Sequence, residues 1–137
     1  MRKLALLLLA IILVFSLILT GCAIPNLIRS SQLLNEGNKS FDDAKYEEAA
    51  ALYEKAIKAN RYNATAYGNK SAALILLKEY EEALELANKA LEINDREAMF
   101  HLNKGEALNN LDENENAIES FNKALELDPE FVDAYNS

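Results

Sequence analysis

Residues 80–93 read YEEALELANKALEI, and residues 46–59 read YEEAAALYEKAIKA, nearly the same stretch 34 positions earlier. In both stretches apolar residues recur at intervals of three and four, which is the spacing of one face of an amphipathic helix. Residues 114–127, NENAIESFNKALEL, fall a further 34 positions along and keep the apolar pattern. The chain therefore repeats one helical unit three times.

Each repeated helix follows another amphipathic stretch, so every unit holds two helices. In the middle unit the turn is only two or three residues, around Lys78 and Glu79, which makes the two helices antiparallel neighbours. Small residues recur at the same spacing on both helices, and we expect them to face one another where the axes approach. They are Gly37, Ser71 and Gly105 on the first helices and Ala49, Ala83 and Ala117 on the second.

Short polar residues close each unit at Asn60, Asn94 and Asp128. We expect them to cap the N-terminus of the next helix, because such side chains accept hydrogen bonds from its free N–H groups. Pro129 directly after Asp128 suits the first helical position, where no N–H is needed.

The 34-residue unit, with Ala-x-x-x-Tyr at Ala49 and Tyr53, Ala-x-x-x-Phe at Ala117 and Phe121, and a closing Pro129, resembles the tetratricopeptide repeat. The resemblance implies an all-α fold, a right-handed superhelix of helical hairpins. It assigns three units, 30–63, 64–97 and 98–131, and makes 132–137 the truncated start of a fourth repeat.

The N-terminal segment has a different character. Arg2 and Lys3 precede a nearly unbroken apolar run over 4–19, which ends in Leu19-Thr20-Gly21-Cys22. This ending resembles the lipobox of prokaryotic lipoproteins, whose cysteine is acylated and whose signal peptide, here 1–21, is cleaved before it. The resemblance implies a lipid anchor at Cys22, followed by a short tether over 22–29 that Pro25 keeps from being helical. An uncleaved signal anchor is the alternative.

Either anchor places the domain outside the cytoplasm. In a Gram-negative cell we expect the outer membrane or periplasm, and in a Gram-positive or archaeal cell the outer face of the cell membrane. Attachment to the membrane must be covalent or by an inserted segment, because the charge of the domain does not favour binding to the lipid surface. The net charge is −8 for the whole chain and −10 for 22–137, which disfavours both anionic lipid headgroups and nucleic acid.

The residue inventory argues against catalysis. Cys22 is the only cysteine and His101 the only histidine, and His101 falls at a packing position of the repeat. A nucleophile–base pair and a zinc site are therefore not expected. Residues 112–116, DENEN, imitate a calcium loop, but Ala117 follows where glycine is required. We expect no enzymatic activity, no cofactor and no metal.

In the resembled family, first-helix residues line a concave groove that holds a partner. The groove residues carried over to this chain are Leu34, Asn35, Asn38, Phe41, Asn69, Ala72, Ile75, Met99, Leu102, Asn103 and Glu106. They combine apolar side chains with asparagines, whose amides both donate and accept hydrogen bonds. We therefore expect a non-catalytic scaffold that binds an apolar peptide segment, with its backbone read by the row Asn35, Asn69 and Asn103.

Chaperone-binding members of the family hold a C-terminal carboxylate with basic residues and asparagines. Asn38 and Asn69 match that arrangement, but Leu34, Met99 and Asn103 occupy the basic positions. A carboxylate clamp is therefore not expected.

The alternative function is self-association. Only six residues follow the third unit, so Ile118, Phe121 and Leu125 are expected to be poorly covered. An uncapped edge of this kind favours end-to-end pairing of two copies.

Overall fold

The computed structural model describes residues 24–130, and all regular structure in this range is helical. A first helix covers residues 24–42. It is followed by α2 (Tyr46–Ala59), α3 (Ala64–Leu76), α4 (Tyr80–Ile93), α5 (Ala98–Asn110) and α6 (Asn114–Leu127). Pro129 and Glu130 are again helical, so this proline does sit at the start of a helical segment.

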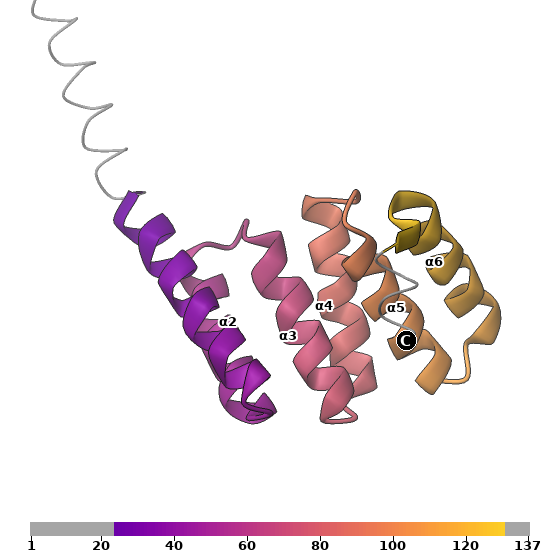
Figure 1. Ribbon diagram of the computed structural model, residues 1–137, viewed down its shortest axis with the longest axis horizontal. Helices are drawn as coiled ribbons and strands as arrows, with labels where there is room; N and C mark the ends of the chain where they lie inside the picture. Colours follow the sequence, from indigo (N-terminus) through magenta and orange to yellow (C-terminus); the bar gives the residue numbers. More distant parts are fainter. Residues whose placement is uncertain (1–23, 131–137) are drawn as a thin grey trace, which may run out of the picture.

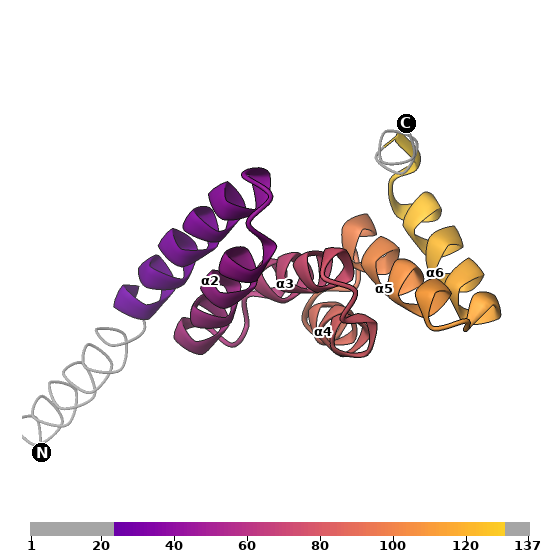
Figure 2. The ribbon, with the colours of Figure 1, turned by 90° about the horizontal axis from the view of Figure 1, so that it is seen from below.

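The helices form a stack of antiparallel hairpins. Each of α2 to α6 packs against its neighbours in sequence, and α3 also packs directly against α5 (Figure 1). Seen from below, the first helix and α5 lie on either side of α3, while α2 and α4 lie along the opposite side (Figure 2). This arrangement places the first helix, α3 and α5 on one concave side. Each of them is the first helix of its hairpin.

The turn inside each hairpin has one repeated geometry. Ala44, Lys78 and Asp112, which are 34 positions apart, have φ values of 58°, 65° and 64°. The next residue in each turn donates its N–H to a carbonyl five positions back, for example Glu79 to Leu74 at 2.9 Å. This is the left-handed helix ending that glycine usually supplies, and here it is built without glycine.

The turns between hairpins correct one expectation. Asn60 and Asn94 are the C-cap residues of α2 and α4. Their Oδ1 atoms accept from the N–H two positions along, each at 3.1 Å. The N-cap of α3 is instead Asn63, which accepts from the Ala66 N–H at 3.2 Å. Four residues separate the helices, so Asn60 and Asn94 are too far back to cap the next one.

Core packing depends on exchanges between large and small residues. A Cβ on Gly37 would lie 2.6 Å from the Tyr53 ring, and one on Gly105 would lie 2.5 Å from the Phe121 ring. These glycines therefore make room for aromatic rings. Ser71 does face its expected partner, since its hydroxyl donates to the Ala83 carbonyl at 2.7 Å.

The expected break at Pro25 is not found. Residues 24–29 are helical and continue directly into the first repeat helix. The signal peptide 1–21, Cys22 and the start of a fourth repeat at 132–137 lie outside the described residues. Among the described helices, none combines the length and the apolar character that crossing a membrane requires.

Candidate functional site

A cavity of about 450 Å³ lies on the concave side of the stack. The first helix, α3 and α5 supply most of its walls, and α2 contributes one side chain. The lining residues are Asn38, Phe41, Asp42, Tyr53, Asn69, Ala72, Ile75, Leu76, Met99, Asn103 and Glu106. The ring of Phe41 is held in place by Tyr46, with their centroids 5.3 Å apart in an edge-on arrangement.

Eight of the eleven groove residues expected from sequence line this cavity. The other three, Leu34, Asn35 and Leu102, do not. Leu102 is only 3% exposed and packs with Ala98 and Ala124, so its side chain belongs to the core. Leu34 packs against the core from the first helix, while Asn35 is exposed but outside the cavity. The eleven positions carried over from the family thus include both cavity and core residues.

Tyr53 is a cavity residue that the groove expectation omitted, because it lies on a second-of-pair helix. It stands in the Ala-x-x-x-Tyr pattern, so the sequence did mark it as a packing residue. Its side chain is 1% exposed, and its hydroxyl donates to Asn38 Oδ1 at 2.9 Å. Burial is the main cause that raises the pKa of Tyr53 to about 12. The phenol therefore stays neutral and remains a hydrogen-bond donor at physiological pH.

Two amides complete the polar floor of the cavity. Asn69 Nδ2 donates to Asn38 Oδ1 at 2.8 Å, so this one oxygen accepts from both Asn69 and Tyr53. Within residues 24–130, the Asn38 Nδ2 and the Asn69 Oδ1 are left without a hydrogen-bond partner. Every fully buried side-chain polar atom in this range does have one, so both groups are accessible. They offer one donor and one acceptor, the two kinds of group that pair with a peptide backbone.

The three asparagines of the expected row are not equivalent. Asn103 is 3% exposed, and its Nδ2 donates to the Gly68 carbonyl at 2.8 Å, which ties α5 to α3. Asn35 lies outside the cavity. Of the row, Asn69 and Asn103 line the cavity, but the Asn103 Nδ2 is already used to join α5 to α3; Asn38 supplies a further amide.

The cavity carries negative charge and no positive charge. Asp42 and Glu106 are among its lining residues, whereas no lysine, arginine or histidine is. The remaining walls are mainly apolar, and Leu76 on α3 is 49% exposed there.

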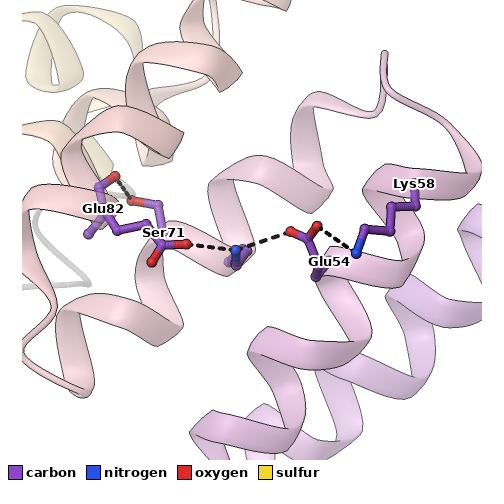
Figure 3. Close-up of polar contacts among 6 residues, drawn as sticks. Glu54, Lys58, Ser71 and Glu82 are labelled. Atoms are coloured by element: carbon purple, nitrogen blue, oxygen red, sulfur yellow. Dashed lines mark hydrogen bonds and ion pairs between the residues drawn. The ribbon is translucent and has the colours of Figure 1, made fainter.

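Lys70, the one lysine of α3, faces away from this cavity. Lys70 Nζ lies 3.1 Å from Glu54 Oε2 on α2 and 2.8 Å from Glu82 Oε1 on α4, and its side chain is 12% exposed (Figure 3). Burial opposes charge on both Glu54 and Lys70, but their mutual hydrogen bond and Coulombic attraction prevail. The pKa of Glu54 is lowered and the pKa of Lys70 is raised. This ion network joins three helices.

A larger cavity, of about 860 Å³, lies between α4, α5 and α6. It occupies the place that corresponds, one repeat later, to the Lys70 network. Lys104 stands where Lys70 does, but Asn88 and Asn116 replace the two glutamates. Its walls are mostly polar and include several glutamates. The smaller cavity is the better candidate site, because apolar walls around a few convergent polar groups are typical of binding sites.

The sequence matches two family models described as tetratricopeptide repeat, one over residues 40–104 and the other over residues 98–131. The tetratricopeptide repeat domain of Arabidopsis OM64 is 30% identical, with a TM-score of 0.75 over 77% of this chain and 87% of that one. The chain belongs to the tetratricopeptide repeat family. The expected all-α fold is confirmed.

Two further similar tetratricopeptide repeat structures are complexes with a binding partner. The first such domain of Spaghetti (RPAP3), with HSP90 peptide SRMEEVD, is 30% identical, with a TM-score of 0.74 over 76% of this chain and 82% of that one. The yeast Sti1 TPR2B–pHsp70 complex is 27% identical, with a TM-score of 0.71 over 75% and 82% of the respective chains. No individually curated protein is detectably similar in sequence.

Proposed function

We propose that this protein is a non-catalytic scaffold that binds an apolar peptide segment of a partner protein in its concave cavity. The main observation behind this proposal is the cavity of about 450 Å³. Two accessible amide groups lie in it among the apolar side chains of Phe41, Ile75, Leu76 and Met99. The apolar walls supply affinity through burial, and the amides of Asn38 and Asn69 orient the peptide backbone.

The similar structures support this proposal. The first tetratricopeptide domain of Spaghetti (RPAP3) binds an HSP90 peptide, and Sti1 TPR2B forms a complex with pHsp70. The chain shares their fold over three quarters of its length. Within residues 24–130, no group of three or more histidine, cysteine, aspartate or glutamate side chains is placed to hold a metal ion.

A matched pair of leucine variants tests the cavity. Leu76 is 49% exposed and lines it, whereas Leu125 on α6 is 44% exposed and lies elsewhere. We expect Leu76→Asp to weaken capture of the native partner at least about tenfold and Leu125→Asp to leave it unchanged, since truncating a central contact commonly costs this much. The reverse result would move the binding site to α6.

The proposal includes an anchor at Cys22, which places the scaffold on the outer side of a prokaryotic membrane. It rests on the lipobox-like Leu19-Thr20-Gly21-Cys22 after an apolar run. Two or three acyl chains on this residue are sufficient for stable membrane attachment. Mass spectrometry of the mature N-terminus should find an acylated Cys22, and Cys22→Ala should block processing. An intact N-terminus in the membrane fraction would indicate the uncleaved signal anchor instead.

A second candidate function is self-association through α6. Ile118 is 59% exposed and Leu125 is 44% exposed, one heptad apart on the same face. Phe121 was expected to share this exposure, but its ring packs against Gly105. Sedimentation distinguishes the two functions, because self-association predicts a dimer that dissociates in Ile118→Asp without any effect of Leu76→Asp.

A further inference from the structure

The charge on the cavity walls is one-sided. Asp42 lies near the C-terminal end of the first helix and is exposed, and Glu106 lies on α5 and is half-buried. These two helices flank α3, which carries the apolar strip of Ile75 and Leu76 (Figure 2). A peptide lying along that strip therefore runs between two carboxylates.

Two lysines near this region are paired with carboxylates outside the cavity. Lys70 is engaged with Glu54 and Glu82 through the ion network that joins α2, α3 and α4. Lys45 pairs with Asp43 at 3.3 Å, while Asp42 makes no ion pair in the part of the chain that the structure describes. The domain as a whole is also acidic, with a net charge of −10 over residues 22–137. The local and the overall fields thus have the same sign.

The HSP90 and HSP70 peptides in similar structures, SRMEEVD and SGPTIEEVD, end in acidic residues. An acidic tail would meet Asp42 and Glu106 here, and the cavity offers no cation in return. Like charges placed opposite one another disfavour binding, and opposite charges favour it and speed association.

From this charge pattern, and resting on the proposed function, we infer that the cavity selects an apolar segment flanked by lysine or arginine. Apolar side chains of the segment occupy the apolar strip of Ile75 and Leu76, and they also contact Met99 on α5. Its flanking cations lie beside Asp42 and Glu106, and its backbone contacts the amides of Asn38 and Asn69. Peptides with acidic flanks are rejected.

Three fluorescent peptides with one apolar core test this selection, flanked on both sides by lysine, by serine or by glutamate. Each is titrated by fluorescence anisotropy against the full chain in nanodiscs of zwitterionic phosphatidylcholine, so that the lipid does not attract the basic peptide. One exposed ion pair, with Asp42, predicts that the lysine-flanked peptide binds roughly two- to fivefold more tightly than the serine-flanked one. The advantage should disappear at about 0.5 M salt, where exposed charges are screened.

Two variants locate the effect. Asp42→Asn, alone and combined with Glu106→Gln, should bring the Kd values of the lysine- and serine-flanked peptides closer together. The control variant Glu115→Gln/Glu119→Gln removes two charges from α6 and should keep the preference, which separates local charge from the overall field. Asp42→Asn alone suffices if the double variant is poorly folded, because Asp42 is exposed.

The outcomes separate this inference from the proposed function. Equal binding of the lysine- and serine-flanked peptides, abolished by Leu76→Asp, would overturn the charge selection and leave the groove intact. Tightest binding of the glutamate-flanked peptide would also overturn the selection. No binding of any of the three peptides would count against the groove itself.

Discussion

Gly68 on α3 and Phe100 on α5 share one volume, and exchanging them tests how the stack is packed. A Cβ on Gly68 would lie 2.3 Å from Phe100 Cε1 and 2.5 Å from its Cδ1, and the ring is 1% exposed. In the preceding pair of helices the equivalent positions hold Leu34 and Ala66, which pack in one cluster. The large side chain therefore changes helix from one repeat to the next.

The magnitudes follow from these contacts. Phe100→Ala empties a buried ring site and should cost about 3–5 kcal/mol of unfolding free energy. Gly68→Leu overfills the same site and should cost about 1–3 kcal/mol or more. The double variant reproduces the Leu34–Ala66 arrangement and replaces a helical glycine, which itself gains about 1 kcal/mol. We expect the double variant to be only about 1–2 kcal/mol less stable than the wild type.

Urea unfolding followed by circular dichroism at 222 nm measures all four proteins. The predicted coupling between the two sites is about 2 kcal/mol or more, with the second substitution rescuing the first. Thr65→Leu on the exposed side of α3 is the control for adding a leucine, and should change stability by less than about 0.5 kcal/mol. Additive losses in the double variant would refute the shared-volume explanation.

Three further predictions concern the polar contacts. Because the pKa of Tyr53 is raised to about 12, the folded state holds its proton longer than the unfolded state. The stability difference between wild type and Tyr53→Phe, followed by urea unfolding, should be constant below pH 10 and fall by up to about 3 kcal/mol towards pH 12; a flat difference would contradict it. Asn38→Ala leaves the buried Tyr53 hydroxyl without its acceptor and should cost about 1–3 kcal/mol in the same assay, while Asn38→Asp keeps the acceptor and should cost less. Lys70→Met breaks both ion pairs of Lys70 and should lower the unfolding free energy by about 1–2 kcal/mol. The Lys58 side chain is 74% exposed beside Glu54, so Lys58→Met should lower the unfolding free energy by less than about 0.5 kcal/mol. Equal losses for the two variants would show that the ion network does not stabilise the fold.

The 34-residue register made the helices and their pairing predictable from sequence, because amphipathic spacing and short turns fix both. The register also led to most of the cavity residues. It failed where a neighbouring repeat changes the contact of an equivalent position. Asn69 and Asn103 are equivalent by spacing, yet Asn69 contacts another side chain while Asn103 holds the Gly68 carbonyl.

Other features needed the three-dimensional structure. Tyr53 reaches the cavity from α2 because Gly37 on the first helix leaves space for its ring. This space depends on how the two helices pack against each other. The sequence predicted Asn60 as the N-cap of α3, but Asn63 is the N-cap in the structure. The length of the turn, rather than the kind of side chain, decides which asparagine meets the free N–H groups. Periodicity in the sequence carries neither kind of information.

Backbone and methyl NMR during titration with an apolar, lysine-flanked peptide tests the binding site most directly. The cavity predicts that the largest shifts cluster on Phe41, Ala72, Ile75, Leu76 and Met99, and that Leu76→Asp abolishes them. Shifts centred on Ile118 and Leu125 of α6, unaffected by Leu76→Asp, would contradict the assignment of binding to the concave side.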